Sequence, residues 1–145
     1  MASEVHALVR RLAGSLTSGD MVGMARLHRF PCPFHAYGRT EVYADPAALM
    51  RGVALWREER WRKGTRQIEG RITALDLPRS QRLRVWVHWT HAMADGSVRE
   101  VGTDLLFLTR IEGPWLIEMV DFLTLPAPLD GAAGADMGYA VAAAG

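Results

Sequence analysis

A change in hydrophobic period near residue 65 constrains the fold of this chain more than any other feature. Before it, apolar residues recur every three or four positions, as on one face of a helix. After it, they alternate with polar residues over four long segments, at 66–77, 82–94, 97–111 and 115–125. Helices followed by a run of neighbouring strands predict an α+β fold, in which the helices cover one face of an antiparallel sheet.

Three helices are expected ahead of these strands. Ser3 is a candidate N-cap for the first, Asp20 for the second, and Asp45 followed by Pro46 for the third. Residues 34–43 are rich in aromatic and β-branched side chains, which predicts one or two short strands bent at Gly38. The apolar stripes of the first and third helices are Val5, Leu8, Val9, Leu12 and Leu16, and Leu49, Val53 and Trp56.

The charged run at 57–60 falls on the third helix. We interpret it as solvated surface, because Glu58 with Arg62 and Glu59 with Lys63 have the spacing of favourable ion pairs along an exposed helix face.

Length and composition indicate one domain. The chain has 145 residues, of which 49% are hydrophobic, and a net charge of +1. We expect a domain over 1–128 and an Ala/Gly-rich tail over 129–145. A near-neutral chain is a poor match for a general nucleic-acid surface. No apolar run approaches a membrane span, and the N-terminus lacks a signal-peptide pattern, so we expect a cytoplasmic protein with neither nucleic-acid nor membrane partners.

The single cysteine, Cys32, cannot form a disulfide within the chain. We expect a small buried side chain. His88 and His91 have a spacing that suits metal ligands on a helix, but residues three apart on a strand point to opposite faces. We therefore expect neither a metal nor a cofactor.

Turn signals between the strands predict which side chains share a face. If Asp95-Gly96 and Glu112-Gly113 are two-residue turns, Val87 faces Asp104, and Asp104 faces Asp121. The more apolar face should pack on the helices; it carries Ile68, Gly70, Ile72, Ala74, Val85, Val87, Trp89, His91, Asp104, Leu106, Leu108, Ile117, Met119, Asp121 and Leu123. The other face carries Trp86, Phe107 and Phe122 among charged residues, and such aromatics predict a homodimer through that face.

Two aspartates opposite one another in an apolar pocket cannot both ionise cheaply, so one should hold a proton near neutral pH. Asp104 and Asp121 are therefore candidates for a general acid and a general base, with His91 assisting. A β-bulge in either hairpin would move one of them to the other face. An inner aspartate can also simply cap a helix or bond to an Arg or Tyr side chain. The residues expected to contact a ligand are Trp89, Trp56, Tyr37, His35, Met119, Val87 and Leu106.

The order of elements and three short runs resemble the nuclear transport factor 2-like superfamily, which includes SnoaL-like polyketide cyclases, ketosteroid isomerases and limonene-epoxide hydrolases. The runs are Ser18-Gly19-Asp20, Asp45-Pro46-Ala47-Ala48-Leu49 and Gly113-Pro114-Trp115-Leu116-Ile117. The resemblance implies a cystatin-like cone with three N-terminal helices on a curved antiparallel sheet, an apolar cavity, and frequent dimers.

The catalytic patterns of that superfamily are not reproduced here. Asp121-Phe122-Leu123 resembles the end of the epoxide hydrolases, but Trp89 and His91 stand where those enzymes carry an Arg and a second Asp. The ketosteroid isomerase base would fall near Phe34 or His35, where no carboxylate stands. We therefore favour a domain that binds a small apolar molecule. The alternatives are a small enzyme that uses the aspartate pair on an apolar, perhaps cyclic, substrate, and a partner-binding role of the outer face.

Overall fold

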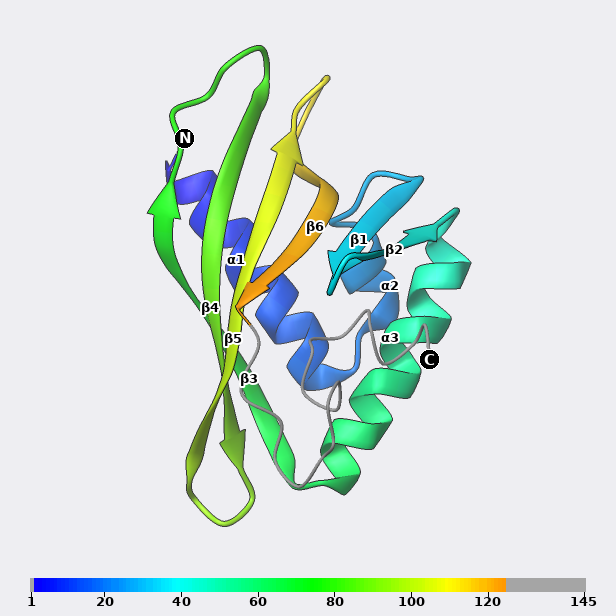
Figure 1. Cartoon of the computed structure of the whole chain (residues 1–145), viewed down its shortest axis with the longest axis vertical. Helices are drawn as coiled ribbons and strands as arrows, with labels where there is room; N and C mark the ends of the chain where they lie inside the picture. The colour runs from blue at the N-terminus through cyan, green and yellow to red at the C-terminus, as the bar shows by residue number, and fades with distance from the viewer. Residues whose placement is uncertain (1, 125–145) are drawn as a thin grey trace.

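The computed structural model describes residues 2–124, so the tail expected over 129–145 lies outside the described residues. Two helices come first, then a short strand pair, a third helix and four long strands (Figure 1). The elements are α1 (Ala2–Ser18), α2 (Met21–Ala25), β1 (Cys32–Ala36), β2 (Arg39–Tyr43), α3 (Pro46–Arg62), β3 (Thr65–Leu75), β4 (Arg82–Met93), β5 (Val98–Thr109) and β6 (Leu116–Thr124).

The strands form one sheet in the order β2-β1-β6-β5-β4-β3. Figure 1 shows α1 lying across one face of this sheet, with α3 beside it. We call this the inner face, and the opposite one the outer face. The predicted α+β fold is confirmed. The sheet is not wholly antiparallel, however, because β1 pairs with β6 in parallel. That pairing adds β1 and β2 to the edge of the four long strands.

The helix starts follow the sequence signals closely. The Asp20 side chain accepts a hydrogen bond from the Gly23 amide at 2.9 Å, and Asp45 accepts one from Ala48 at 2.9 Å. Both contacts satisfy an amide that the first helical turn leaves without a partner. The first helix begins at Ala2, one residue before the expected cap.

The charged run on α3 is not simply solvated surface. Arg57 reaches the end of α1, where its Nε and Nη2 donate to the carbonyl oxygens of Leu16 and Thr17 at 2.7 and 2.6 Å. Arg60 is only 4% exposed. The earlier interpretation is therefore wrong for these two residues, since helix packing turns them inward. Glu59 forms an ion pair with Lys63, as expected. Glu59 also forms an ion pair with Arg62, which was expected to pair with Glu58.

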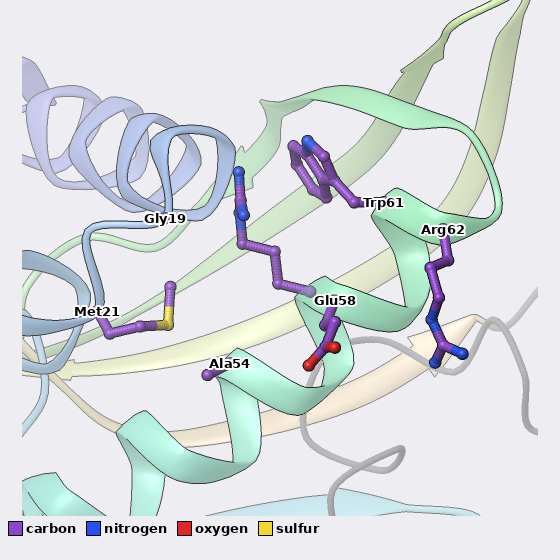
Figure 2. A pocket seen from close by; sticks show the side chains of 7 residues that line it. Gly19, Met21, Ala54, Glu58, Trp61 and Arg62 are labelled. Atoms are coloured by element: carbon purple, nitrogen blue, oxygen red, sulfur yellow. The ribbon is translucent and has the colours of Figure 1, made fainter.

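A pocket of about 430 Å³ lies beside Arg57, between the α1–α2 connection and α3 (Figure 2). Met21 borders it on one side and Trp61 on the other. The Arg57 guanidinium lies 3.8 Å from the centre of the Trp61 ring, so this ring supports the cation that joins α1 to α3.

We expect Arg57→Lys to lower the free energy of unfolding by about 1–2 kcal/mol, because an ammonium cannot donate to two carbonyls in a fixed fork. Urea denaturation measures the change. Arg51→Lys, at an exposed position on the same helix, is the control and should stay within about 0.5 kcal/mol of the parent protein. Equal effects of the two substitutions would contradict an anchoring role for Arg57.

Candidate functional site

The register of β4 with β5 agrees with the prediction at its centre. Val87 pairs with Asp104, although the connection at Asp95-Gly96 is longer than a two-residue turn. The register shifts by one residue between the pair Trp89–Gly102 and the pair Thr90–Glu100, and this shift compensates for the longer connection. Asp104 therefore lies on the inner face, as predicted.

The register of β5 with β6 differs from the prediction. The strands pair as expected at Leu108 and Ile117, but Phe107 then pairs with Met119, which leaves Glu118 as an extra residue in β6. Asp104 consequently faces Phe122, and Asp121 faces Leu105. The prediction that the two aspartates lie opposite one another is wrong, because one bulged residue turns the rest of β6 over.

This inversion changes both faces of the sheet. Val120 and Phe122 are 0% and 5% exposed and belong to the inner face. The predicted inner positions of Met119, Asp121 and Leu123 are wrong, as is the outer position of Phe122. Met119 instead lines a pocket of about 420 Å³ with Phe107, its partner in the register.

Asp104 is the buried carboxyl of the inner face. It is 6% exposed and lies on the same face as Val87 and Leu106, which are both fully buried. Burial raises the pKa of Asp104 well above its usual range, and the Trp89 indole opposes this shift because it favours the ionised form. The charge of Asp121, across the sheet, raises the pKa further. The carboxyl is therefore neutral over a range in which an exposed aspartate is ionised.

The Trp89 indole lies next to this carboxyl along the inner face. Its Nε1–H does not reach good hydrogen-bond geometry with any of the residues 2–124. It is near enough to the Asp104 carboxyl to favour the ionised form, so this carboxyl is its neighbouring acceptor, although the two groups are poorly aligned. Asp104 and Trp89 together place a carboxyl and an indole N–H among apolar side chains.

Two glycines flank Trp89 in the sheet. Gly70 on β3 and Gly102 on β5 are its partners on either side. A Cβ atom built on Gly70 would lie 2.8 Å from Cζ3 of Trp89, closer than such atoms approach one another. Gly102 has a φ of +149°, which side chains rarely adopt. The position of the indole therefore depends on the absence of a side chain at Gly70, while Gly102 supplies a backbone conformation that other residues rarely adopt.

His91 continues the row of inner side chains on β4, where it is 4% exposed. Its Nδ1 lies 3.3 Å from the Thr65 hydroxyl, and its ring meets Trp56 edge-on at 5.9 Å. The predicted residues Trp56, Trp89 and His91 thus lie inside, along with Val87 and Leu106. Sequence reasoning missed Thr65 and Arg60, because alternation does not identify a strand's first residue and a helical arginine is usually solvated.

Two other predicted ligand contacts lie elsewhere. Tyr37 is 60% exposed, in the turn between β1 and β2. His35 is half-buried on the outer face, where the Thr40 hydroxyl lies 2.6 Å from its Nδ1. The parallel pairing of β1 with β6 sets His35 beside Asp121. The structure therefore brings together two candidate site residues, but on the face opposite Asp104.

Cys32 is buried, as expected, and burial raises the pKa of its thiol to about 12. It is therefore a poor nucleophile at neutral pH. Within residues 2–124, no three His, Cys, Asp or Glu side chains gather in a way that could hold a metal ion. No helix in the same range is long and apolar enough to cross a membrane.

Comparison with solved structures identifies the fold. The chain is similar to an NTF-2-like protein of unknown function from Shewanella oneidensis, with 12% identity, a TM-score of 0.65, and 83% and 96% of the two chains covered. A protein of unknown function with a cystatin-like fold from Nostoc punctiforme matches at 12% identity and a TM-score of 0.63, covering 87% and 92%. Aln2 from a Streptomyces species matches at 18% identity and 0.66, covering 85% and 89%.

The chain therefore has the NTF2-like, cystatin-like fold, as the sequence resemblance implied. No protein-family model matches the sequence, and no curated protein is significantly similar to it. Since one fold of this kind can carry many activities, the function has to be argued from the site.

We expect the stability of the parent protein to fall, relative to Asp104→Asn, as pH rises above about 4. Because the folded state holds the Asp104 proton more tightly than the unfolded chain, the unfolded chain loses it first, and each further pH unit costs up to ~1.4 kcal/mol until the folded-state pKa is reached. Urea denaturation from about pH 4 to 8 measures the difference.

Glu69→Gln, at an exposed position on β3, is the control and should leave the pH dependence unchanged. A constant difference between Asp104→Asn and the parent protein across this range would show that Asp104 ionises normally in the folded state.

Proposed function

We propose that the chain binds a small, largely apolar molecule against the inner face of the sheet, where the neutral carboxyl of Asp104 donates a hydrogen bond to an oxygen atom of that molecule. The observation that carries this proposal is the burial of Asp104 among apolar side chains, with burial as the main influence on its pKa. A carboxyl kept neutral in apolar surroundings is a hydrogen-bond donor.

The neighbouring Trp89 supports the same kind of ligand. Its indole Nε1–H is a second donor, and it makes no well-aligned hydrogen bond with any of the residues 2–124, since its contact with Asp104 falls short of good geometry. A buried donor in a poorly aligned contact loses part of the free energy of a hydrogen bond, which a ligand oxygen would recover. Two adjacent donors in an apolar wall are complementary to a carbonyl or ether oxygen on a hydrocarbon body, rather than to a cation or a strongly charged group.

The enzyme alternative loses support from the geometry. Its proton transfer relied on Asp104, Asp121 and His91 sharing one site. Asp121 lies on the outer face, and His91 lies four residues along β4 from the partner of Asp104, which is about 13 Å along an extended strand. We therefore propose binding rather than turnover as the role of the inner face.

A matched pair of probes tests the hydrogen bond. We expect 1-indanone, which carries a carbonyl, to bind more tightly than indane, which does not. Asp104→Leu, which keeps the branched shape of the side chain but cannot donate, should weaken binding of 1-indanone roughly five-fold and leave indane unchanged, as the loss of one neutral hydrogen bond implies. Asp104→Asn keeps a donor and should bind both probes like the parent protein. Tryptophan fluorescence titration gives the affinities.

Unchanged binding of 1-indanone to Asp104→Leu would remove Asp104 from ligand recognition. Equal weakening of both probes would show that the substitution disturbs the packing, and the donor role would then be rejected in favour of a purely apolar contact.

We also propose a homodimer through the outer face, centred on Trp86 and Phe107. Both side chains are half-buried on that face, and Phe107 borders the pocket of about 420 Å³ there. Large aromatic side chains on a partly exposed sheet face are typical of protein interfaces. Phe122, which was expected in the same patch, lies inside and does not contribute.

Light scattering coupled to size exclusion tests the dimer. We expect twice the chain mass at micromolar concentration, and Phe107→Glu should reduce it to the mass of one chain, because a buried charge without a partner is costly in an interface. Leu55→Glu, at an exposed apolar position on α3, is the control and should remain dimeric. A parent protein with the mass of one chain would contradict the proposal.

A further inference from the structure

A second pocket, of about 600 Å³, lies at the end of the molecule where α1 begins. The first turns of α1, the residues after α2 and the connection between β5 and β6 enclose it. Figure 1 shows the start of α1 and the β5–β6 connection at one end of the molecule, while α3 passes into β3 at the other end. Its volume falls within the range of small-molecule sites.

Positive charge is concentrated in this pocket. Three arginines line it, Arg11, Arg26 and Arg110, against one carboxylate, Glu4, so two positive charges are in excess. The whole chain carries a formal net charge of only +1. Glu4 pairs with Arg110, whereas Arg11 and Arg26 form no ion pair with any of the residues 2–124. We call this site the arginine pocket.

The Arg110 guanidinium is held in place before any ligand arrives. Besides the ion pair with Glu4, its Cζ lies 4.6 Å from the centre of the Trp115 ring, and Trp115 is itself only 4% exposed. Arg110 is therefore held against a buried ring and paired with Glu4, so the positive charge left for an anion is that of Arg11 and Arg26. The start of α1, a helix of 17 residues, contributes positive potential in the same place.

Apart from Ser3, the remaining lining side chains are apolar. Leu8 from α1 and Leu27 from the segment after α2 face the pocket together with Pro114. An inorganic ion would use the arginines alone, whereas a molecule with a hydrocarbon body could also cover these side chains.

We propose that the arginine pocket binds a small organic anion, whose carboxylate or phosphate group lies between Arg11 and Arg26 and whose apolar body packs on Leu8 and Leu27. Guanidinium groups match the oxygens of either head group through paired hydrogen bonds. This ligand differs in chemistry from the one proposed for the inner face, and the two sites lie on different parts of the fold.

Isothermal titration of the full chain with benzoate, phenyl phosphate and the neutral benzyl alcohol tests the proposal, and the two anions distinguish the head groups. We expect saturable binding of at least one anion at a stoichiometry of one, and none of benzyl alcohol. Arg11→Gln and Arg26→Gln should each weaken anion binding about ten-fold or more, as the loss of a charge-assisted hydrogen bond implies. Binding should also weaken as salt is raised.

Arg10→Gln is the matched control, because Arg10 is the neighbouring exposed arginine on α1 and does not line the pocket. It should change the affinity less than about two-fold, as should Asp104→Leu, which alters the inner face only. No saturable binding of either anion below about 10 mM would overturn the proposal, since that limit already corresponds to a very weak site. Equal losses in Arg10→Gln and Arg11→Gln would also overturn it, and inorganic phosphate binding as tightly as phenyl phosphate would reject the apolar contact.

Discussion

The pairing of β4 with β5 is the constraint on which the inner face depends. Val87 and Asp104 are direct partners, so every second side chain from Leu83 to His91 faces the helices. A shift of one residue would turn Trp89 and His91 outward and bring Trp86 and His88 in. The irregularity near Trp89 absorbs the longer connection and preserves this register. The packing of α1 and α3 over the sheet then has one apolar surface to cover.

Within that surface, burial of the Asp104 carboxyl is unfavourable, and the neighbouring residues reduce the unfavourable free energy. Burial alone would make an ionised carboxylate expensive, and the simplest response is for the group to retain its proton. The Trp89 indole can lie beside it only because Gly70, its partner on β3, has no side chain. Apolar walls, a neutral acid and an indole N–H together favour a neutral ligand oxygen. The arginine pocket differs from the inner face in the charge of the ligand that it favours, since its exposed guanidinium groups favour an anion.

Much of the fold was predictable because it depends on local signals. The caps at Asp20 and Asp45 and the alternation along the strands follow from backbone geometry and from the burial of one face. Part of the candidate site followed as well, since Trp89, His91 and Asp104 share a face through a register that turn signals approximated. Arg57 and Arg60 could not be placed correctly, because a charged helix position turns inward only when a partner element covers it.

The sequence by itself determined that three helices precede the four long strands and that Asp104 belongs to the side of β5 facing those helices. Only the tertiary structure decided on which face of the sheet Asp121 lies. One extra residue, Glu118, in β6 reverses the alternation, and nothing in the local pattern marks it, because Met119 and Val120 are both acceptable in either direction. Packing decides between the two registers of β6. The observed register buries Val120 and Phe122 on the inner face, which removes more apolar surface from water than burial of Asp121 would.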